Sequence, residues 1–232
     1  MSEAPLHSVR LLHKAMVARD IMEIRFEKPS GFSYLAGQFV QFKIPHADAH
    51  VMRNFSLSSH PDDDHLEFCA KIIPEGKASV FFERLAVGEE AYITPANGFF
   101  VCRPEHSPRK IFIATGAGIA PIMGMIKGQL KDIASTGAVR LVFGARAPED
   151  MFWTDRLEQL ATAHPQFSFY VTISRPTSAW AGHAGRVTAH LPELLFRDAD
   201  YYVCGSQEMV ADVRQQLLAA GAPTKNMHFE VF

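Results

Sequence analysis

The chain has 232 residues, of which 47% are hydrophobic, and its formal net charge at pH 7 is −2. This length allows one large or two small domains with a substantial core, so we expect a soluble globular protein. The balance of 23 basic against 25 acidic residues gives no strongly positive surface, which argues against nucleic-acid binding. No basic segment followed by an apolar run opens the chain, and no run of about 18 apolar residues occurs in it. We therefore expect a cytoplasmic protein without membrane insertion.

The cysteines and histidines do not indicate a metal centre. Cys69, Cys102 and Cys204 lie far apart in the sequence, unlike a disulfide framework or paired zinc or iron–sulfur ligands. The tightest histidine group, at residues 46–50, follows Pro45 and is expected in a loop between strands, where nothing fixes two rings on one face. We therefore expect no metal site.

The N-terminal part of the chain alternates short β-rich runs with turn signals, the pattern of an antiparallel barrel or sandwich. One helix is expected at residues 78–85, where apolar residues have helical spacing and stop before Gly88. It should lie over one end of the barrel. Six strands, enough to close a small barrel, are expected at residues 9–17, 21–26, 38–44, 53–58, 65–72 and 91–94.

Beyond a polar stretch at residues 103–109, strands and helices alternate, which indicates a parallel sheet covered on both faces. Strands are expected at residues 110–114, 139–143, 167–173, 200–204 and 227–231, with helices at 121–134, 150–163, 186–195 and 207–220. The predicted fold has two domains: an N-terminal six-stranded antiparallel β-barrel over residues 1–104, and a C-terminal α/β Rossmann-like parallel sheet over residues 105–232. Ligands of such sheets bind at the carboxyl ends of the strands.

A glycine-rich turn follows the first strand of the α/β domain. Residues 115–120 read Thr-Gly-Ala-Gly-Ile-Ala, and Pro121 is expected to open the next helix. Backbone N–H groups in such a turn can approach a pyrophosphate, and the helix N-terminus adds partial positive charge. The usual dinucleotide motif has a third glycine where Pro121 stands and an acidic residue about 20 positions later, which this chain lacks. The turn alone fits a simple strand-to-helix connection equally well.

Four short motifs together are more specific. They are Arg53-Asn54-Phe55-Ser56 in a barrel strand, Gly76-Lys77-Ala78-Ser79 at the barrel helix, the glycine-rich turn, and Cys204-Gly205-Ser206 after the fourth strand of the α/β domain. Their order and spacing resemble the ferredoxin–NADP reductase superfamily, most closely the reductase modules of bacterial oxygenases and the NAD(P)H-flavin reductases. The resemblance covers essentially the whole chain. It implies FAD on the barrel and NADPH or NADH on the α/β domain.

On the barrel, the resemblance implies that Arg53 faces the FAD pyrophosphate, Phe55 packs on the flavin and Ser56 lies near flavin N5. An arginine suits a pyrophosphate because its guanidinium is planar and permanently charged. The helix start would hold a phosphate through free N–H groups and the Ser79 hydroxyl, although Ser79 could equally be only a helix cap. The sequence departs from the family at residues 95–99, where Pro-Ala-Asn-Gly-Phe replaces Gly-Pro-Phe-Gly, so contacts from this loop are in doubt.

On the α/β domain, Thr115 and Gly116 would lie beside the nicotinamide and pyrophosphate, and Cys204 with Gly205 would flank the nicotinamide ring. Glu230 would help to bind nicotinamide or relay protons, and Phe232 would either cover the flavin or simply end a strand. The implied catalytic residues are Ser56, Cys204 and Glu230. The implied cofactor-binding residues are Arg53, Asn54, Phe55, Ser56, Lys71, Ile72, Ile73, Gly76, Lys77, Ala78, Ser79, Thr115, Gly116, Gly118, Arg146, Ser174, Arg175, Cys204, Gly205 and Phe232.

The choice of nicotinamide stays open at this stage. Ser174 and Arg175 follow the third strand where NADPH-preferring relatives contact the 2′-phosphate, a group that suits arginine. The same segment, continuing through Trp180 and Val187, also resembles oxygenase reductases that use NADH.

The expected reaction is hydride transfer from nicotinamide C4 to flavin N5, after which electrons pass to an acceptor. The chain has no group of four clustered cysteines, so the acceptor would be separate: a ferredoxin or an oxygenase component. One alternative is a flavin reductase that releases reduced free flavin. Another is an electron-transfer or regulatory subunit without turnover of its own. We expect a monomer or weak dimer.

Overall fold

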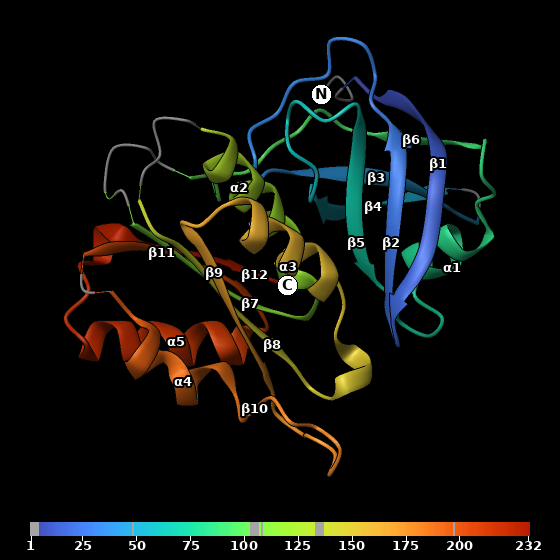
Figure 1. Cartoon of the computed structure of the whole chain (residues 1–232). Coiled ribbons are helices and arrows are strands. Elements are labelled where there is room, and N and C mark those ends of the chain that lie inside the picture. Colours follow the sequence, from blue (N-terminus) through green and yellow to red (C-terminus); the bar gives the residue numbers. More distant parts are fainter. Residues whose placement is uncertain (1–4, 48, 103–106, 108, 133–136, 197) are drawn as a thin grey trace.

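The computed structural model describes residues 5–47, 49–102, 107, 109–132, 137–196 and 198–232. Two six-stranded sheets lie side by side, one formed by the N-terminal strands and one by the C-terminal strands with their helices (Figure 1). The predicted combination of an antiparallel barrel-like domain and a Rossmann-like α/β domain is confirmed. The boundary that we expected between residues 104 and 105 lies outside the described residues.

All six barrel strands were predicted, and they pair in the order β4-β3-β6-β1-β2-β5. They are β1 (His7–Ala18), β2 (Ile21–Glu27), β3 (Phe39–His46), β4 (Ala49–Ser56), β5 (His65–Lys71) and β6 (Glu90–Ile93). A bridge between Leu57 and Phe68 joins the β4 edge to the β5 edge, so the sheet closes on itself.

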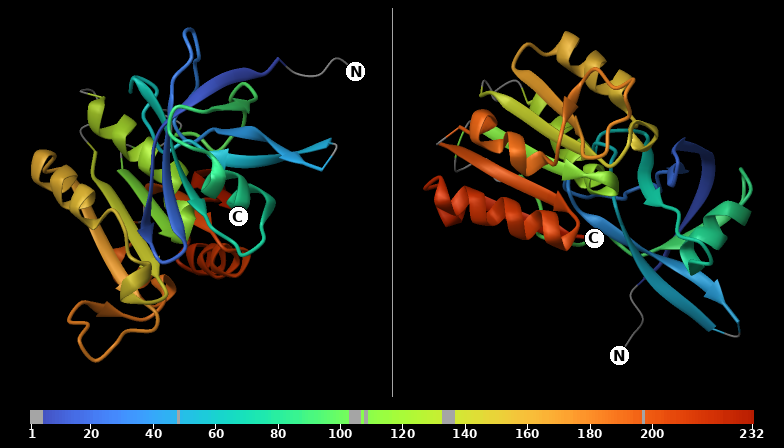
Figure 2. Two further views of the ribbon diagram at one scale, coloured as in Figure 1. Left: turned by 90° about the vertical axis from the view of Figure 1, so that its right-hand side faces the viewer. Right: turned by 90° about the horizontal axis from the view of Figure 1, so that it is seen from below.

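The expectation of a loop at residues 46–50 was wrong. Pro45 pairs with His50 and His46 with Ala49, because β3 and β4 continue as a hairpin that projects from the barrel (Figure 2). Among the described residues, no group of three or more histidine, cysteine or acidic side chains is placed to hold a metal ion.

The barrel core is an aromatic cluster centred on Phe42. Its ring is fully buried and lies 5.1–5.6 Å from the rings of Phe26, Phe55, Phe68 and Phe82. Phe82 comes from the predicted helix, α1 (Lys77–Arg84), and is 1% exposed. Burial of this side chain docks α1 onto the barrel and fixes the position of the helix N-terminus.

The C-terminal sheet is entirely parallel, with the order β10-β9-β8-β7-β11-β12. Its strands are β7 (Arg109–Thr115), β8 (Val139–Ala145), β9 (Phe167–Ile173), β10 (His183–Ala184), β11 (Ala199–Gly205) and β12 (Met227–Val231). The helices are α2 (Ile119–Lys131), α3 (Thr154–Ala163), α4 (Val187–Leu194) and α5 (Gln207–Ala219). Only the two-residue strand β10, which carries no periodic signal, had not been predicted.

Alternation along the strands sends successive side chains to opposite faces of the sheet. On β7, Phe112 packs with α2 and α3 on the face toward the barrel, whereas Ile111 and Ile113 pack with α4 and α5 on the far face (Figure 1). Both faces are therefore covered, as the apolar runs of these strands predict. None of the helices within the described ranges is long and apolar enough to cross a membrane.

Two helix starts differ from the prediction. A 3₁₀ turn at Gly116–Gly118 leads directly into α2, so Pro121 is the third residue of that helix and does not open it. The helix expected from Asp150 begins instead at Thr154, after a separate 3₁₀ turn at Pro148–Asp150. The end predicted for α2, Ala134, lies outside the described residues.

The two domains share a continuous apolar contact. Ile21 and Cys69 of the barrel are 3% and 6% exposed and belong to the core cluster that is built mainly by α2, α3 and the parallel sheet. Gly124 of α2 allows this contact, because a Cβ there would lie 3.0 Å from the carbonyl oxygen of Ser59 and 3.2 Å from that of Leu57. The domains are therefore packed against one another rather than merely tethered.

We predict that Phe42→Ala destabilises the protein by about 3–5 kcal/mol, because it removes the ring at the centre of the aromatic cluster and leaves a cavity. Urea denaturation measures this change in the free energy of unfolding. The control is Phe99→Ala, whose ring is 89% exposed, and we expect it to change stability by no more than about 0.5 kcal/mol. Similar stabilities for the two variants would contradict the central role of Phe42.

Candidate active site

The order of the parallel strands determines where a ligand can bind. β8 and β11 flank β7 on opposite sides, so the chain leaves β7 in one direction and later returns on the other. Open parallel sheets bind ligands in the crevice at the carboxyl ends of the strands beside such a reversal. Here the crevice lies between Thr115, which ends β7, and Gly205, which ends β11. Both views of Figure 2 show the C-terminus between the two domains.

A cavity of about 830 Å³ opens at this place and is lined by both domains. Its size falls within the range of cofactor sites, about 300–1,000 Å³. Of the residues predicted from the sequence, the cavity is lined by Arg53, Asn54, Phe55, Ser56, Lys71, Ile73, Gly76, Lys77, Ala78, Ser79, Thr115, Gly116, Gly118, Arg146, Ser174, Gly205 and Phe232. Residues 120 positions or more apart in sequence therefore meet at one site.

Ser56 lines the cavity and contacts Glu230 of the other domain, which is not itself among the lining residues. Ser56 ends β4 and is 4% exposed, and its hydroxyl donates a hydrogen bond of 3.3 Å to Glu230 Oε1 on β12. Burial raises the pKa of the Glu230 carboxyl above its ordinary value, while the hydrogen bond from Ser56 opposes this shift. The pair can therefore hold a proton at higher pH than an exposed glutamate can.

Cys204 does not line the cavity but lies directly beneath it. It is fully buried at the end of β11, and burial, followed by the charge of Glu230, raises the pKa of its thiol far above the ordinary value. A thiol that stays protonated is a poor nucleophile, so Cys204 can serve only as a packing surface. The turn at Gly118 rests on it, because a Cβ on Gly118 would lie 2.4 Å from the Cys204 carbonyl oxygen.

The barrel side of the cavity presents positive charge and free N–H groups. Arg53 and Lys77 are exposed and form no ion pair within the described part of the chain, and the N-terminus of α1 has Gly76 as its cap, with no side-chain capping bond in that part. The first N–H groups of a helix need an acceptor from outside the helix. This combination fits the phosphates of a dinucleotide cofactor such as FAD.

Ser79 is not the helix cap that we considered. It is the third residue of α1 and is 5% exposed, and its hydroxyl oxygen accepts a 2.8 Å hydrogen bond from the Ile73 N–H. It therefore holds the loop at residues 73–76 against the helix. Its own hydroxyl hydrogen is still available to a ligand. Ile72 is turned away from the cavity and packs against the barrel core, and its N–H donates to the Asp20 carbonyl.

Phe55 has two sets of neighbours. It lines the cavity, and its ring also makes edge contacts with Phe42 and Phe82, at centroid distances of 5.6 and 5.1 Å. The barrel core thus fixes the orientation of the ring that a flavin would meet. Phe55 therefore lies at the cavity wall, and the flavin contact that the resemblance implies for it stays a prediction.

On the α/β side, the ends of β8 and β9 bring Arg146 and Ser174 to the cavity, whereas Arg175 is exposed and does not line it. The backbone N–H of Arg175 donates to the Arg146 carbonyl over 2.7 Å, so the two arginines lie on adjacent loops. Phe232 is 54% exposed at the cavity, and its N–H donates to the Gly205 carbonyl over 3.1 Å. The C-terminus is therefore tied to the end of β11.

Several residues that line the cavity had not been found from the sequence. They are Arg19, Asp20, Ile21, Cys69, Ala117, Ala120, Gly144, Ala145, Asp150, Gly185, Arg186, Val187, Thr188, Ser206, Glu208, Met209 and Asp212. Arg186 and Glu208 form a 2.7 Å ion pair between the starts of α4 and α5. The expected carboxyl ends of the strands could have indicated residues 144–145 and 206–209, but no sequence signal indicated the β1–β2 turn.

Two family models match separate parts of the chain. The family model described as "Oxidoreductase FAD-binding domain" matches residues 8–101, and the one described as "Oxidoreductase NAD-binding domain" matches residues 112–215. The barrel and most of the parallel sheet are therefore matched by separate models.

Curated relatives match nearly the whole chain. The ferredoxin–NADP reductase B of Sorangium cellulosum is 29% identical over 99% of each chain. The toluate 1,2-dioxygenase electron transfer component of Pseudomonas putida is 30% identical, over 99% of this chain and 67% of that protein. The reductase component of the propane 2-monooxygenase of Rhodococcus jostii is 29% identical, over 93% of this chain and 60% of that protein. The chain thus spans all of the first relative but about two thirds or less of the other two.

Solved structures have the same fold. The Amycolatopsis cytochrome P450 reductase GcoB superposes with a TM-score of 0.89 at 25% identity, over 100% of this chain and 72% of that chain. A ferredoxin NADP⁺ reductase from Neisseria gonorrhoeae, solved with bound FAD and NADP, superposes with a TM-score of 0.84 over 99% of each chain. At 22% identity, this second similarity shows the fold alone.

The fold, the two matched domains and the cavity between them define an FAD-containing, nicotinamide-dependent reductase. The chain belongs to the ferredoxin–NADP reductase superfamily.

We predict that Glu230 makes the stability of the protein depend on pH. Near pH 4 and below, the carboxyl is protonated in both the folded and unfolded states, so Glu230→Gln changes little. At higher pH the unfolded chain ionises more readily than the folded protein, whose Glu230 pKa is raised, so the native protein loses stability relative to Glu230→Gln. Melting temperatures of both proteins between pH 4 and 8 measure this difference.

Two further variants complete that measurement. Ser56→Ala removes the hydrogen bond that lowers the Glu230 pKa, so the loss of stability should extend to higher pH. Glu83→Gln, at an exposed position of α1, is the control and should follow the native protein. A constant difference between the native protein and Glu230→Gln across this pH range would contradict the role given to burial.

Proposed function

We propose that this reductase takes hydride from NAD(P)H at the cleft between its domains and passes electrons to a separate protein of the ferredoxin or oxygenase-component type. The observation that carries the proposal is the contact between Ser56 and Glu230. This contact joins a side chain of the FAD-binding domain, which lines the cavity, to a side chain of the NAD-binding domain just behind the cavity wall. The proposed domain limits are 1–104 and 105–232.

In the proposed site, the barrel residues bind and orient FAD. Arg53 and Lys77 supply positive charge for the pyrophosphate, and the N–H groups of residues 77–79 supply hydrogen-bond donors at the start of α1. Phe55, held by Phe42 and Phe82, offers a fixed aromatic surface to the ring system. The remaining proposed contacts on this side are Asn54, Lys71 and Ile73.

The parallel sheet binds the nicotinamide dinucleotide in the proposal. The turn at Thr115–Gly118 presents backbone N–H groups, and Gly205 and the buried Cys204 form the floor beneath the ring. Arg146, Ser174 and Arg175 stand on the two outer loops, where a second phosphate or ribose would lie. The bound cofactors supply the redox chemistry itself, a hydride transfer to the flavin.

The protein's own part in the reaction is to orient the rings and to manage one proton. Two rings held by separate domains meet without loss of translational freedom at the moment of reaction. When Glu230, with its raised pKa, is protonated, it can donate to the Ser56 oxygen, and the Ser56 hydroxyl hydrogen is then free to donate to a ring nitrogen. Phe232 lies at the open side of the cavity, where it can exclude water from the flavin position.

The proposed acceptor follows from the relatives. The similar proteins include a ferredoxin–NADP reductase, an electron transfer component of a dioxygenase and a reductase component of a monooxygenase. A cytoplasmic location and a monomeric or weakly dimeric state stay predictions from the sequence.

We predict that the purified protein is yellow and that its flavin absorbance bleaches on anaerobic addition of NADH, NADPH or both. Titration with each nicotinamide in turn measures the preference that the sequence leaves open. A colourless protein that reduces added FMN or riboflavin would instead identify a flavin reductase. A yellow protein that neither nicotinamide bleaches would contradict the proposed activity.

We predict that Arg53→Ala lowers flavin occupancy about tenfold or more at limiting FAD, because a charge-assisted contact to the pyrophosphate contributes about 1.5–3 kcal/mol. Fluorescence titration of the flavin-free protein with FAD measures the affinity. Arg84→Ala, an exposed arginine at the end of α1 that does not line the cavity, is the matched control. Equal affinities in both variants would remove Arg53 from the site.

A further inference from the structure

Two carboxylates of the barrel are buried where the domains meet. Glu23 on β2 and Glu67 on β5 are 3% and 2% exposed. Arg25 pairs with Glu67 in the strand register, and Glu23 and Arg25 project from the same face of β2 because they are two positions apart. This face of the barrel is the one that the α/β domain covers, since Ile21 on the same face belongs to the core cluster of that domain.

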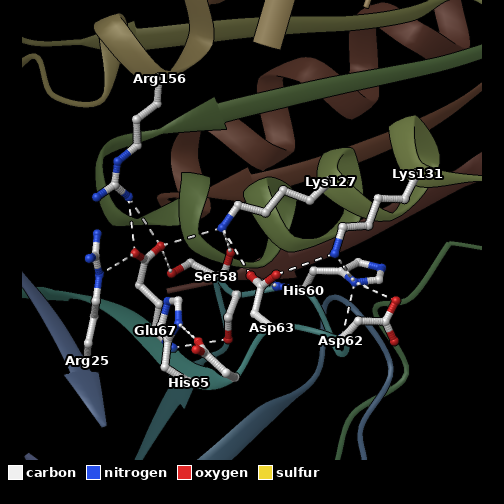
Figure 3. A network of polar contacts seen from close by, with 12 residues as sticks. Arg25, Ser58, His60, Asp62, Asp63, His65, Glu67, Lys127, Lys131 and Arg156 are labelled. Atoms are coloured by element: carbon white, nitrogen blue, oxygen red, sulfur yellow. Dashed lines mark hydrogen bonds and ion pairs between the residues drawn. The ribbon is translucent and has the colours of Figure 1, made fainter. Parts of the chain in front are cut away.

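Most of the charge that balances these carboxylates comes from the other domain. Arg156 of α3 contacts both: its Nη1 lies 3.2 Å from Glu67 Oε2, and its Nη2 lies 2.5 Å from Glu23 Oε2. Lys127 of α2 lies 3.8 Å from Glu67 Oε1, and Figure 3 shows Lys127, Arg156 and Arg25 around Glu67. Within the described part of the barrel, the contributing cation is Arg25, at 3.0 Å from Glu67 and 2.8 Å from Glu23.

The electrostatics show that Glu67 is ionised in this position. Burial would raise the pKa of its carboxyl, but the positive charges of Lys127, Arg156 and Arg25 together lower it below the ordinary value. A buried charge without such partners is strongly unfavourable. Docking of α2 and α3 in this position therefore supplies two of the three cationic side chains that contact Glu23 and Glu67.

Each carboxylate is also connected to the rim of the cavity. Trp153, just before α3, donates a 2.7 Å hydrogen bond from Nε1 to Glu23 Oε2, and the preceding 3₁₀ turn carries Asp150, which lines the cavity. On the barrel side, Arg19 of the β1–β2 turn forms ion pairs with Glu149 and Asp150 of the same 3₁₀ turn. Glu23 is therefore linked through Trp153 to the 3₁₀ turn that forms ion pairs with Arg19, where the barrel side and the α/β side of the cavity meet.

Glu67 is connected in the same way to the catalytic end of β4. Its Oε1 accepts a 3.1 Å hydrogen bond from the Ser58 hydroxyl, and its backbone carbonyl accepts one of 2.8 Å from the Ser58 N–H. Lys127 in turn donates to the Ser58 carbonyl over 3.3 Å. Ser58 is two residues from Ser56, the residue that meets Glu230 across the domains.

We propose that Glu23, Glu67 and Arg156 form a positioning device that fixes how the two domains dock, and thereby the alignment of the nicotinamide and flavin sites. These are positioning residues and do not touch either cofactor site. The inference rests on the proposed function for its kinetic consequence only. The charge arrangement selects one docking position, because a shift of α3 would leave two carboxylates buried without their main partner.

The test uses Arg156→Gln in the full-length, flavin-loaded protein. We expect the limiting rate of flavin bleaching at saturating NAD(P)H to fall on the order of tenfold to a hundredfold, because small misplacements of reacting groups have effects of this size. Affinity for FAD should stay within about twofold, since the proposed FAD contacts lie on the barrel. Arg156→Lys, which keeps the charge but loses the two-pronged geometry, should have an intermediate rate.

The matched control is Arg140→Gln. Arg140 also donates a hydrogen bond, 2.8 Å to the Leu194 carbonyl, and stacks over an aromatic ring, but all its partners lie within the α/β domain. Its limiting rate should equal that of the native protein. The double variant Arg156→Gln with Glu67→Gln should be no slower than Arg156→Gln alone, because the two residues act through one contact.

Hydrogen exchange supplies a measurement that is independent of activity. Amides at residues 19–24 and 148–153 should exchange faster in Arg156→Gln than in Arg140→Gln, whereas those of β3 and β6 should be unchanged. Equal exchange and equal limiting rates in the two variants would overturn the positioning role. A native protein that neither nicotinamide reduces would contradict the proposed function instead, and the exchange data would still decide whether Arg156 fixes the docking.

Discussion

The docking of the two domains is the constraint on which the site depends. The apolar contact through Ile21 and Cys69 buries surface between the domains but does not fix one relative orientation, because hydrophobic burial is non-directional. The adjacent side chains of Glu23 and Glu67 supply direction, because Arg156 of the other domain contacts both of them. A cavity lined by both domains needs such a contact, since neither domain contains the whole site. The hydrogen bond between Ser56 and Glu230 is a second polar contact between the domains, at the wall of the cavity.

The chemistry of the cleft comes from the ends of secondary-structure elements. The start of α1, the turn into α2 and the ends of β7 and β11 all line one cavity. Arg53 and Lys77 add positive charge on the barrel side, and Gly118 allows the turn to pack closely against Cys204. Cys204 is a poor nucleophile, because burial raises the pKa of its thiol and keeps it protonated. The titratable group beside the proposed flavin position is therefore a glutamate and not a thiolate.

Much of this architecture was predictable, because it rests on local patterns. The alternating barrel strands, the apolar runs of the parallel sheet and the amphipathic helices place sixteen elements close to their observed ranges. The wrong predictions concern segments whose structure depends on a turn. Pro121 was expected to begin a helix, but the 3₁₀ turn at Gly116–Gly118 continues directly into α2. The loop expected at residues 46–50 is a hairpin, because cross-strand pairing overrides the local signals of Pro45 and Asp48.

By itself, the sequence determined two domains of different strand type, a glycine-rich turn after a buried strand, and the motifs that place the chain in its superfamily. These features follow from periodicity and from short spacings, which are properties of neighbouring residues. Only the tertiary structure decided that Arg19 and Asp20 line the cavity, that Ile72 is turned away from it, and that Glu23 and Glu67 are buried against Arg156. The physical reason is that charge balance and burial depend on which distant segments meet. The spacing of neighbouring residues in a single sequence does not reveal that contact.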